Sequence, residues 1–285
     1  MVEVVTQDRS DLGESPLWHQ AEGAFYWVDI NGSKVFHLDP RSGGVEVVHS
    51  GEMVTALGEV HGGGLLMVSN ERISCLRDGS VTTITPLSLT DAVRTNDGKL
   101  DPMGRLWFGT MDLERRDPIA ELFRLDGDQV VPVEDGVILS NGLGWSPSAE
   151  AFYHIDSARR LLYRYDYDLE NGLARNREVL VDMRNATGFP DGMAVDVDGN
   201  LWVAMYRGSR IDVFDPTGNL VHVEPLDAPR PTSLAFGGDT LSDLYVTTAI
   251  DGMDPADVEA QPYTGHVLRL NPGASGLAQG VFPPP

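Results

Sequence analysis

The amino-acid sequence predicts an all-β fold, a six-bladed β-propeller that occupies residues 1–285 as a single domain. Three observations support this prediction: a pattern that recurs six times, strand-like alternation of apolar residues, and an almost complete lack of helical periodicity. Repeated units with several short strands and Gly- or Asp-containing turns match the period of propeller blades. A two-sheet sandwich is the alternative all-β fold, but a sandwich does not predict a sixfold register.

The recurring pattern is a turn rich in Asp, Gly or Pro, then a pair of large apolar residues that opens a β-prone run. The pairs are Phe25-Tyr26, Leu65-Leu66, Leu106-Trp107, Phe152-Tyr153, Leu201-Trp202 and Leu244-Tyr245, whose second members are 40, 41, 46, 49 and 43 residues apart. A second alternating segment follows each pair, beginning at Val35, Ile73, Leu122, Leu162, Ile211 and Val267. We expect each pair and the segment after it to form neighbouring strands of one blade, and the run Val2 to Val5 to join the last blade.

Composition limits the class of partner. The chain has 43 acidic and 21 basic residues, a formal charge of −22, and 41% hydrophobic residues, which suffices for a folded core. Nucleic acids and anionic membranes bind concentrated Lys and Arg, so neither is expected as a partner. Cys75 is the only cysteine, which excludes an intrachain disulfide and a multi-thiolate zinc site. Without a signal-like start or an apolar run of about 18 residues, we expect a cytoplasmic monomer or small homo-oligomer.

The first strand of each blade lines the central channel of a propeller, so equivalent positions on these strands should meet. Four polar residues lie 11 or 12 positions before the second member of a pair: Glu14, Asn96, Asn141 and Asp191. The equivalent positions in the second and sixth units are Val54 and the neighbourhood of Thr232. Oxygen donors without a lysine suit one divalent metal ion, namely calcium, magnesium or manganese, with zinc or iron(II) also possible.

The competing interpretation is that these residues belong to turns, because Asn-Gly and Asp-Gly are common hairpin signals. Their shared register favours the metal site, since unrelated turns would not share it. Other catalytic motifs are absent from the sequence, including a nucleophile elbow, an HExxH zinc motif and a phosphate-binding loop. His154 lies inside a predicted strand and is interpreted as a packed core residue, not a base.

Five segments together resemble one known family. They are LGESPLW (12–18), RTNDGKLDPMGRLWFGTM (94–111), SNGLGWS (140–146), PDGMAVDVDGNLWVA (190–204) and DGMDP (251–255). In this order and spacing they resemble the gluconolactonase / senescence-marker-protein (regucalcin-like) family from about Leu12 to Leu270. The resemblance implies a six-bladed propeller with one divalent metal in the channel and, in many members, hydrolysis of sugar lactones.

The resemblance also implies roles for individual residues. Glu14, Asn141 and Asp191 would be the metal ligands, and Arg94, Asn96 and Glu114 would contact the substrate. The register alone makes Asn96 a fourth ligand, whereas the resemblance places it beside the metal and facing the substrate; we follow the resemblance. The role of Glu114 depends on the resemblance alone, and the nearby residues 115–117 depart from the family pattern.

These inferences predict a metal-dependent hydrolase of carbohydrate metabolism that opens a sugar (aldono-) lactone to the aldonic acid. Water activated by the metal would be the nucleophile, and Asp191 would be the base. Two alternatives remain open. One is a propeller hydrolase of other lactones or of organophosphates, and the other is a non-enzymatic calcium-binding regulatory protein.

Overall fold

The computed structural model describes residues 2–284, which form 24 strands and one short helix. The strands build six four-stranded antiparallel sheets, five of them simple meanders of consecutive strands and the sixth ordered β22-β23-β24-β1, so the prediction of an all-β, six-bladed β-propeller is confirmed. None of the helices formed by these residues is long and apolar enough to cross a membrane.

Each sheet is one blade, numbered here in chain order. Blade 1 consists of β2 (Gly13–His19), β3 (Ala24–Asp29), β4 (Lys34–Asp39) and β5 (Gly44–Ser50). Blade 2 consists of β6 (Val54–Glu59), β7 (Leu65–Ser69), β8 (Arg72–Arg77) and β9 (Ser80–Pro86). Blade 3 consists of β10 (Val93–Leu100), β11 (Leu106–Asp112), β12 (Ala120–Asp126) and β13 (Gln129–Val137).

The remaining blades follow the same plan. Blade 4 consists of β14 (Ser140–Trp145), β15 (Ala151–Asp156), β16 (Leu161–Asp168) and β17 (Leu173–Asp182). Blade 5 consists of β18 (Phe189–Val195), β19 (Leu201–Tyr206), β20 (Arg210–Phe214) and β21 (Leu220–Pro225). Blade 6 consists of β22 (Pro231–Gly237), β23 (Asp243–Thr248), β24 (Leu268–Leu270) and β1 (Glu3–Val4), with α1 (Pro255–Ala260) between β23 and β24 in the chain.

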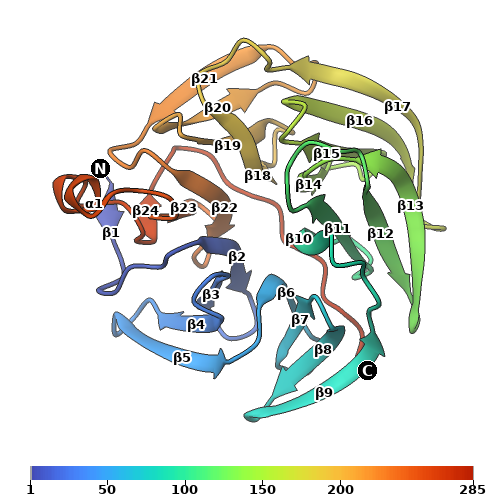
Figure 1. The fold of residues 1–285 in the computed structure, drawn as a ribbon, viewed down its shortest axis with the longest axis horizontal. Coiled ribbons are helices and arrows are strands. Elements are labelled where there is room, and N and C mark those ends of the chain that lie inside the picture. Colours follow the sequence, from blue (N-terminus) through green and yellow to red (C-terminus); the bar gives the residue numbers. More distant parts are fainter. Residues whose placement is uncertain (1, 285) are drawn as a thin grey trace. The chain divides into compact units, whose positions relative to one another are not determined.

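Blade 6 joins the two ends of the chain, as the sequence predicts. The N-terminal strand β1 lies beside β24 (Figure 1), with Glu3 opposite Arg269. The two side chains form an ion pair at 2.6 Å. The N-terminal segment thus completes a sheet whose other three strands come from the C-terminal part of the chain.

Contacts divide the chain into two compact units. One comprises residues 1–53 and 186–278 and holds blades 1, 5 and 6; the other comprises residues 54–185 and 279–285 and holds blades 2, 3 and 4. A single domain over residues 1–285 stays a prediction.

The repeated apolar pairs all lie on the second strand of a blade, where they pack against the neighbouring blade of the same unit. Phe25 of β3 stacks on Tyr245 of β23 with ring centroids 4.5 Å apart, and Trp107 of β11 lies 4.9 Å from Phe152 of β15. All four side chains are essentially inaccessible to solvent. Full burial of one such side chain stabilises the folded state by roughly 1.5–3 kcal/mol. The apolar pairs that recur in the sequence therefore form much of the hydrophobic core between neighbouring blades.

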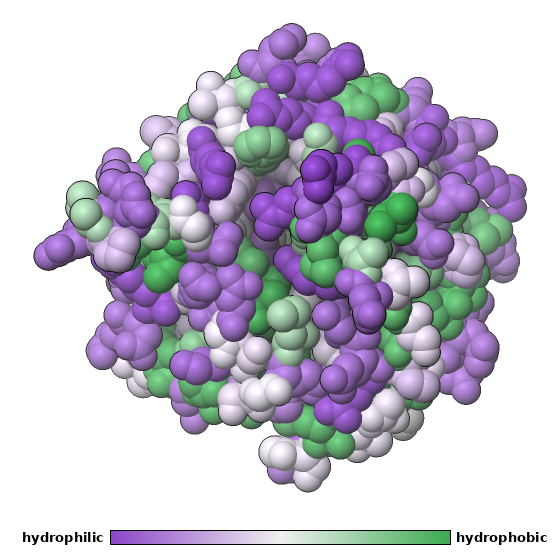
Figure 2. All heavy atoms as spheres, viewed as in Figure 1, coloured by the Kyte–Doolittle hydropathy of each residue, from purple (hydrophilic) through white to green (hydrophobic). Residues whose placement is uncertain are grey.

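Figure 2 shows one face on which hydrophilic side chains predominate and hydrophobic residues are scattered among them. Such scattered apolar residues are ordinary for a protein surface. Most acidic side chains of the described residues are exposed or half-buried, as expected from the cost of burying unpaired charge.

Candidate functional site

Every first strand carries a β-bulge, and every bulge lies at the register position that the sequence singles out. Pairing with the second strand shifts between Glu14 and Leu17, Val54 and Ala56, Thr95 and Gly98, Asn141 and Leu143, Pro190 and Met193, and Pro231 and Ser233. In each case the first strand has one residue more than its partner. A bulge bends the strand and re-aims the side chains beside it, which is why bulges are frequent near active sites.

In the unit of blades 2–4, the structure brings Asn96 and Asn141 together. The Asn96 amide nitrogen donates to Asn141 Oδ1 at 2.9 Å and to the Ser140 carbonyl at 2.8 Å. The Asn141 amide nitrogen donates to Ser157 Oγ at 2.9 Å. The Ser140 carbonyl can only accept, so the Asn96 atom facing it is nitrogen, and the Asn141 atom that accepts from this nitrogen is the carboxamide oxygen. That orientation suits an oxygen ligand for a hard cation.

The two other predicted substrate contacts occupy the same end of blade 3. Arg94 is half-buried on β10, and its guanidinium donates to the Thr95 carbonyl at 2.7 Å. Glu114 lies in the loop after β11, where its backbone N–H donates to the Asp112 carboxylate at 3.2 Å. Its own carboxylate pairs with Arg116 at 2.7 Å, and both side chains are more than 70% exposed. Glu114 is therefore held at the surface by a residue from the segment that departs from the family pattern.

In the unit of blades 1, 5 and 6, Glu14 and Asp191 occupy equivalent bulges on β2 and β18. Glu14 is half-buried, and its carboxylate accepts the N–H of Ser15 at 3.1 Å. Asp191 is 9% exposed. The position predicted near Thr232 has a different role, because the Thr232 hydroxyl donates to the Gly13 carbonyl at 2.5 Å and so holds the residue before Glu14.

A buried acidic residue beside Asn96 is not among the predicted site residues. Asp97 shares the β10 bulge with Asn96, is 8% exposed, and accepts the N–H of Gly98 at 2.7 Å. Burial raises the pKa of Asp97 and lowers the pKa of Lys99, and the attraction between the two charges opposes both shifts. The two-against-one pairing of a bulge, which the sequence does not reveal, places Asn96 and Asp97 together opposite one residue of β11.

The donor chemistry of the predicted ligands fits a hard divalent cation, because carboxylate and carboxamide oxygens are its preferred ligands. Among residues 2–284, no cluster of three or more His, Cys, Asp and Glu side chains is arranged to hold a metal ion. A site of the predicted kind would therefore depend on carboxamide ligands such as Asn141. His154 is buried in β15 and takes no part in such a set, in agreement with its interpretation as a core residue.

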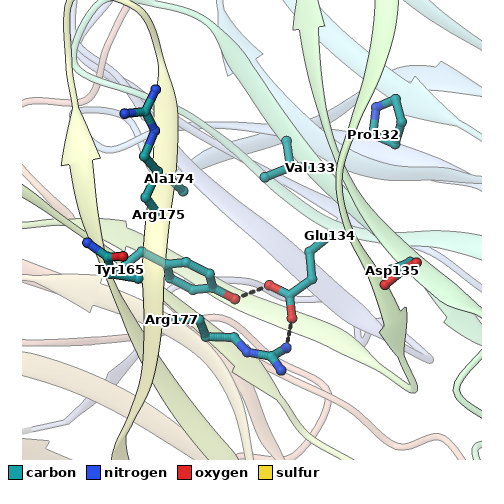
Figure 3. A pocket seen from close by; sticks show the side chains of 9 residues that line it. Pro132, Val133, Glu134, Asp135, Tyr165, Ala174, Arg175 and Arg177 are labelled. Atoms are coloured by element: carbon teal, nitrogen blue, oxygen red, sulfur yellow. Dashed lines mark hydrogen bonds and ion pairs between the residues drawn. The ribbon is translucent and has the colours of Figure 1, made fainter.

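A separate groove of about 510 Å³ lies between the outer strands β13 and β17 (Figure 3). Its half-buried Glu134 accepts hydrogen bonds from the Tyr165 hydroxyl and from Arg177. The Arg177 guanidinium also lies 4.9 Å from the ring centre of Tyr163. Glu134 and Arg177 thus pair with each other inside the groove, and none of the predicted site residues lines it.

Residues 12–250 match the protein family described as the SMP-30/Gluconolactonase/LRE-like region. The chain belongs to this family. It is 35% identical to regucalcin of Danio rerio over 99% of this chain and 97% of that protein. It is 37% identical to the putative sugar lactone lactonase YvrE of Bacillus subtilis (strain 168) over 96% of both chains.

The same relationship holds for a solved structure. The crystal structure of regucalcin from Agrobacterium tumefaciens strain C58, described as a calcium-binding protein, superposes with a TM-score of 0.94 at 26% identity and covers 98% of this chain and 96% of that one. The family predicted from the five sequence segments is therefore confirmed, and so is its six-bladed propeller fold.

Proposed function

We propose that this family member hydrolyses sugar lactones to aldonic acids and that Glu14, Asn141 and Asp191 bind the divalent cation on which the reaction depends. The observation that carries the proposal is the shared bulge position of the three residues on β2, β14 and β18. The near full-length similarity to a putative sugar lactone lactonase supports the reaction class. Similarity to a regucalcin described as calcium-binding supports calcium as the first cation to test.

The residues divide the chemistry as follows. When bound, the cation supplies Lewis acidity to the lactone carbonyl and lowers the pKa of water beside it. Asp191 accepts a proton as general base while the water oxygen bonds to the carbonyl carbon; the bond from that carbon to the ring oxygen then breaks, and Asp191 returns the proton to the ring oxygen, which leaves as a hydroxyl. Arg94 and Asn96 bind ring hydroxyls and set the orientation of the lactone. The product is a carboxylate, whose release is favoured by the net charge of −22.

A panel of aldonolactones tests the reaction. Metal-stripped protein should open them only after calcium, zinc, manganese, magnesium or iron(II) is added back, as measured by proton release in weak buffer. The paired substitution Glu14→Gln and Asp191→Asn should remove both activity and cation binding while leaving the fold intact. Activity that survives exhaustive chelation unchanged would contradict the metal dependence.

Cation binding also predicts an effect on stability. A ligand that binds only the folded state stabilises it by roughly 2.7 kcal/mol at a hundredfold excess over its Kd. Chelation should therefore lower the melting temperature of the natural protein but not that of the Glu14→Gln, Asp191→Asn variant. If this variant melts well below the metal-free parent, the two carboxylates support the fold through other contacts and are wrongly assigned as a metal pair.

A non-enzymatic calcium-binding role is the second candidate, and the similarity to a regucalcin described as a calcium-binding protein supports its calcium-binding part. Both candidate functions require cation binding, but only the first requires hydrolysis of a lactone. Calcium binding without hydrolysis of any aldonolactone in the panel would decide for the second.

A further inference from the structure

A buried polar pair lies directly behind the two carboxamides of the candidate site. His154 on β15 and Ser140 on β14 are 1% and 0% exposed, and His154 Nε2 lies 2.8 Å from Ser140 Oγ. Phe152 stacks on the imidazole with an interplanar angle of 10°. Polar groups in such a core cost free energy unless they are hydrogen-bonded, so the pair is constrained to stay together.

Ser140 connects this pair to the site through its backbone. Its carbonyl accepts the hydrogen bond of Asn96, and the next residue along the strand is Asn141. The same Asn96 nitrogen also reaches Asn141 Oδ1, so a shift of Ser140 would move the acceptor of one bond and the backbone that carries the other. The position of Ser140 therefore sets the geometry of both carboxamides.

On the side away from His154, the Ser140 side chain packs against a glycine of blade 3. Gly109 lies on β11, and a Cβ built there would lie 1.8 Å from Ser140 Oγ and 2.2 Å from its Cβ. Ser140 thus fills the space that any other residue at position 109 would occupy. Gly109 on one side and His154 on the other therefore confine the Ser140 side chain to its position.

We propose that His154 is a positioning residue for the candidate site: its Nε2, through Ser140, holds the Asn96 and Asn141 carboxamides in the arrangement that binds the cation and the lactone. This inference depends on the proposed function. At neutral pH the imidazole is uncharged, because burial lowers the pKa of His154 to about 4 while nearby Asp156 opposes the shift only in part. His154 therefore acts through one neutral hydrogen bond.

The two ring nitrogens give a matched pair of variants. Nε2 bonds Ser140, whereas Nδ1 is buried without a hydrogen-bond partner. The amide group of His154→Gln reaches the place of Nε2, while that of the shorter His154→Asn reaches only the place of Nδ1. Both remove the ring and both keep a polar group in the core, so they differ chiefly in the bond to Ser140.

Calcium affinity is the quantity to measure, because a residue that only stabilised the fold would leave it unchanged. Calcium chloride is titrated calorimetrically into metal-stripped protein without lactone, and kcat and KM are measured separately. Loss of a group that orients a metal ligand costs about 10-fold or more in affinity, so His154→Asn and Ser140→Ala should each lose about 10-fold while His154→Gln stays near the parent. Because Ser140→Ala removes only one oxygen, it keeps the test valid if His154→Asn fails to fold. Combining His154→Asn with Ser140→Ala should cost no more than either alone, because both break the same bond.

His19 supplies the control. It is fully buried at the other end of β2 from Glu14, about 14 Å along the strand by the four residue steps of β3 that lie opposite this span. His19→Asn should lower the melting temperature but leave calcium affinity unchanged. The proposal is wrong if the parent binds calcium and opens lactones while His154→Asn and Ser140→Ala do both equally well. A parent that does neither overturns the proposed function itself, and the positioning role with it.

Discussion

Replacement of Gly192 by alanine is expected to destabilise the protein, because β18 and β22 approach each other too closely there to admit a side chain. A Cβ at position 192 would lie 2.0 Å from Ser233 Oγ, 2.4 Å from its Cβ and 2.6 Å from its Cα. The last of these is a backbone atom, so a change of the Ser233 rotamer cannot relieve the overlap. The strands themselves would have to move apart beside Asp191.

The expected magnitude follows from the number of overlapping atoms. Overpacking of a core contact costs about 1–3 kcal/mol, and because the added Cβ overlaps three atoms of one residue, we expect a loss of about 3 kcal/mol. A loss of 1 kcal/mol lowers the melting temperature of a large domain by roughly 2–4 °C, so a fall of roughly 6–12 °C is expected. Lactone hydrolysis should fall as well, since the displaced segment carries Asp191.

Differential scanning calorimetry with a matched glycine measures the effect. Gly44 on β5 is exposed, and a Cβ there would meet only Ser42 Oγ at 3.2 Å. Gly44→Ala therefore reports the gain from a less flexible unfolded chain without the overlap. Adding Ser233→Gly to Gly192→Ala removes two of the three overlapping atoms and should recover part of the loss. If Gly192→Ala melts at the same temperature as Gly44→Ala, the strands do not meet as described and the reasoning fails.

Three further predictions concern single side chains. Arg94→Ala should raise KM for polyhydroxylated lactones far more than for an unsubstituted lactone of the same ring size; equal losses in steady-state kinetics on both would make Arg94 structural. Arg116→Ala should change stability by less than about 0.5 kcal/mol in denaturant unfolding, because its ion pair is exposed, but should lower KM for polyhydroxylated lactones by releasing Glu114. An unchanged KM would show that Glu114 does not meet the substrate. For His154, a folded-state pKa of about 4 against 6.5 means that only the unfolded chain takes up the proton as the pH falls between these values. The parent should therefore lose up to about 3 kcal/mol over this interval, complete near pH 4, and His154→Gln should lack that part of the loss; identical urea-unfolding profiles against pH would contradict the assigned burial.

Much of the fold could be predicted because the apolar pairs obey a spacing that needs no tertiary information. Phe25-Tyr26 and Leu106-Trp107, for example, lie on second strands, and the segments after them form third strands. Alternation with period 2 is a local property of a half-buried strand. The positions 11 to 13 residues before the second members of the pairs lie at the bulges of the first strands, although the sequence contains no signal that predicts a bulge.

The contacts of the candidate site could not be predicted in the same way. Asn96 and Asn141 are 45 residues apart in the chain and meet only because β10 and β14 pack side by side. The ion pair that holds Glu114 at the surface depends on the conformation of its loop. Side-chain contacts of this kind arise from packing between elements, and a single sequence does not encode them as a periodic signal.

The all-β class, the sixfold repeat, the family and the register of the polar residues were all predictable from the sequence, because each depends only on residue type and spacing along the chain. The tertiary structure decided where those side chains point. An extra residue in each first strand, as at Asn96-Asp97, re-aims the backbone without disturbing the apolar alternation that resumes after it. Gly109 and Gly192 are required because neighbouring blades approach each other too closely there for a Cβ. That requirement depends on the distance between two packed strands, which the sequence does not show.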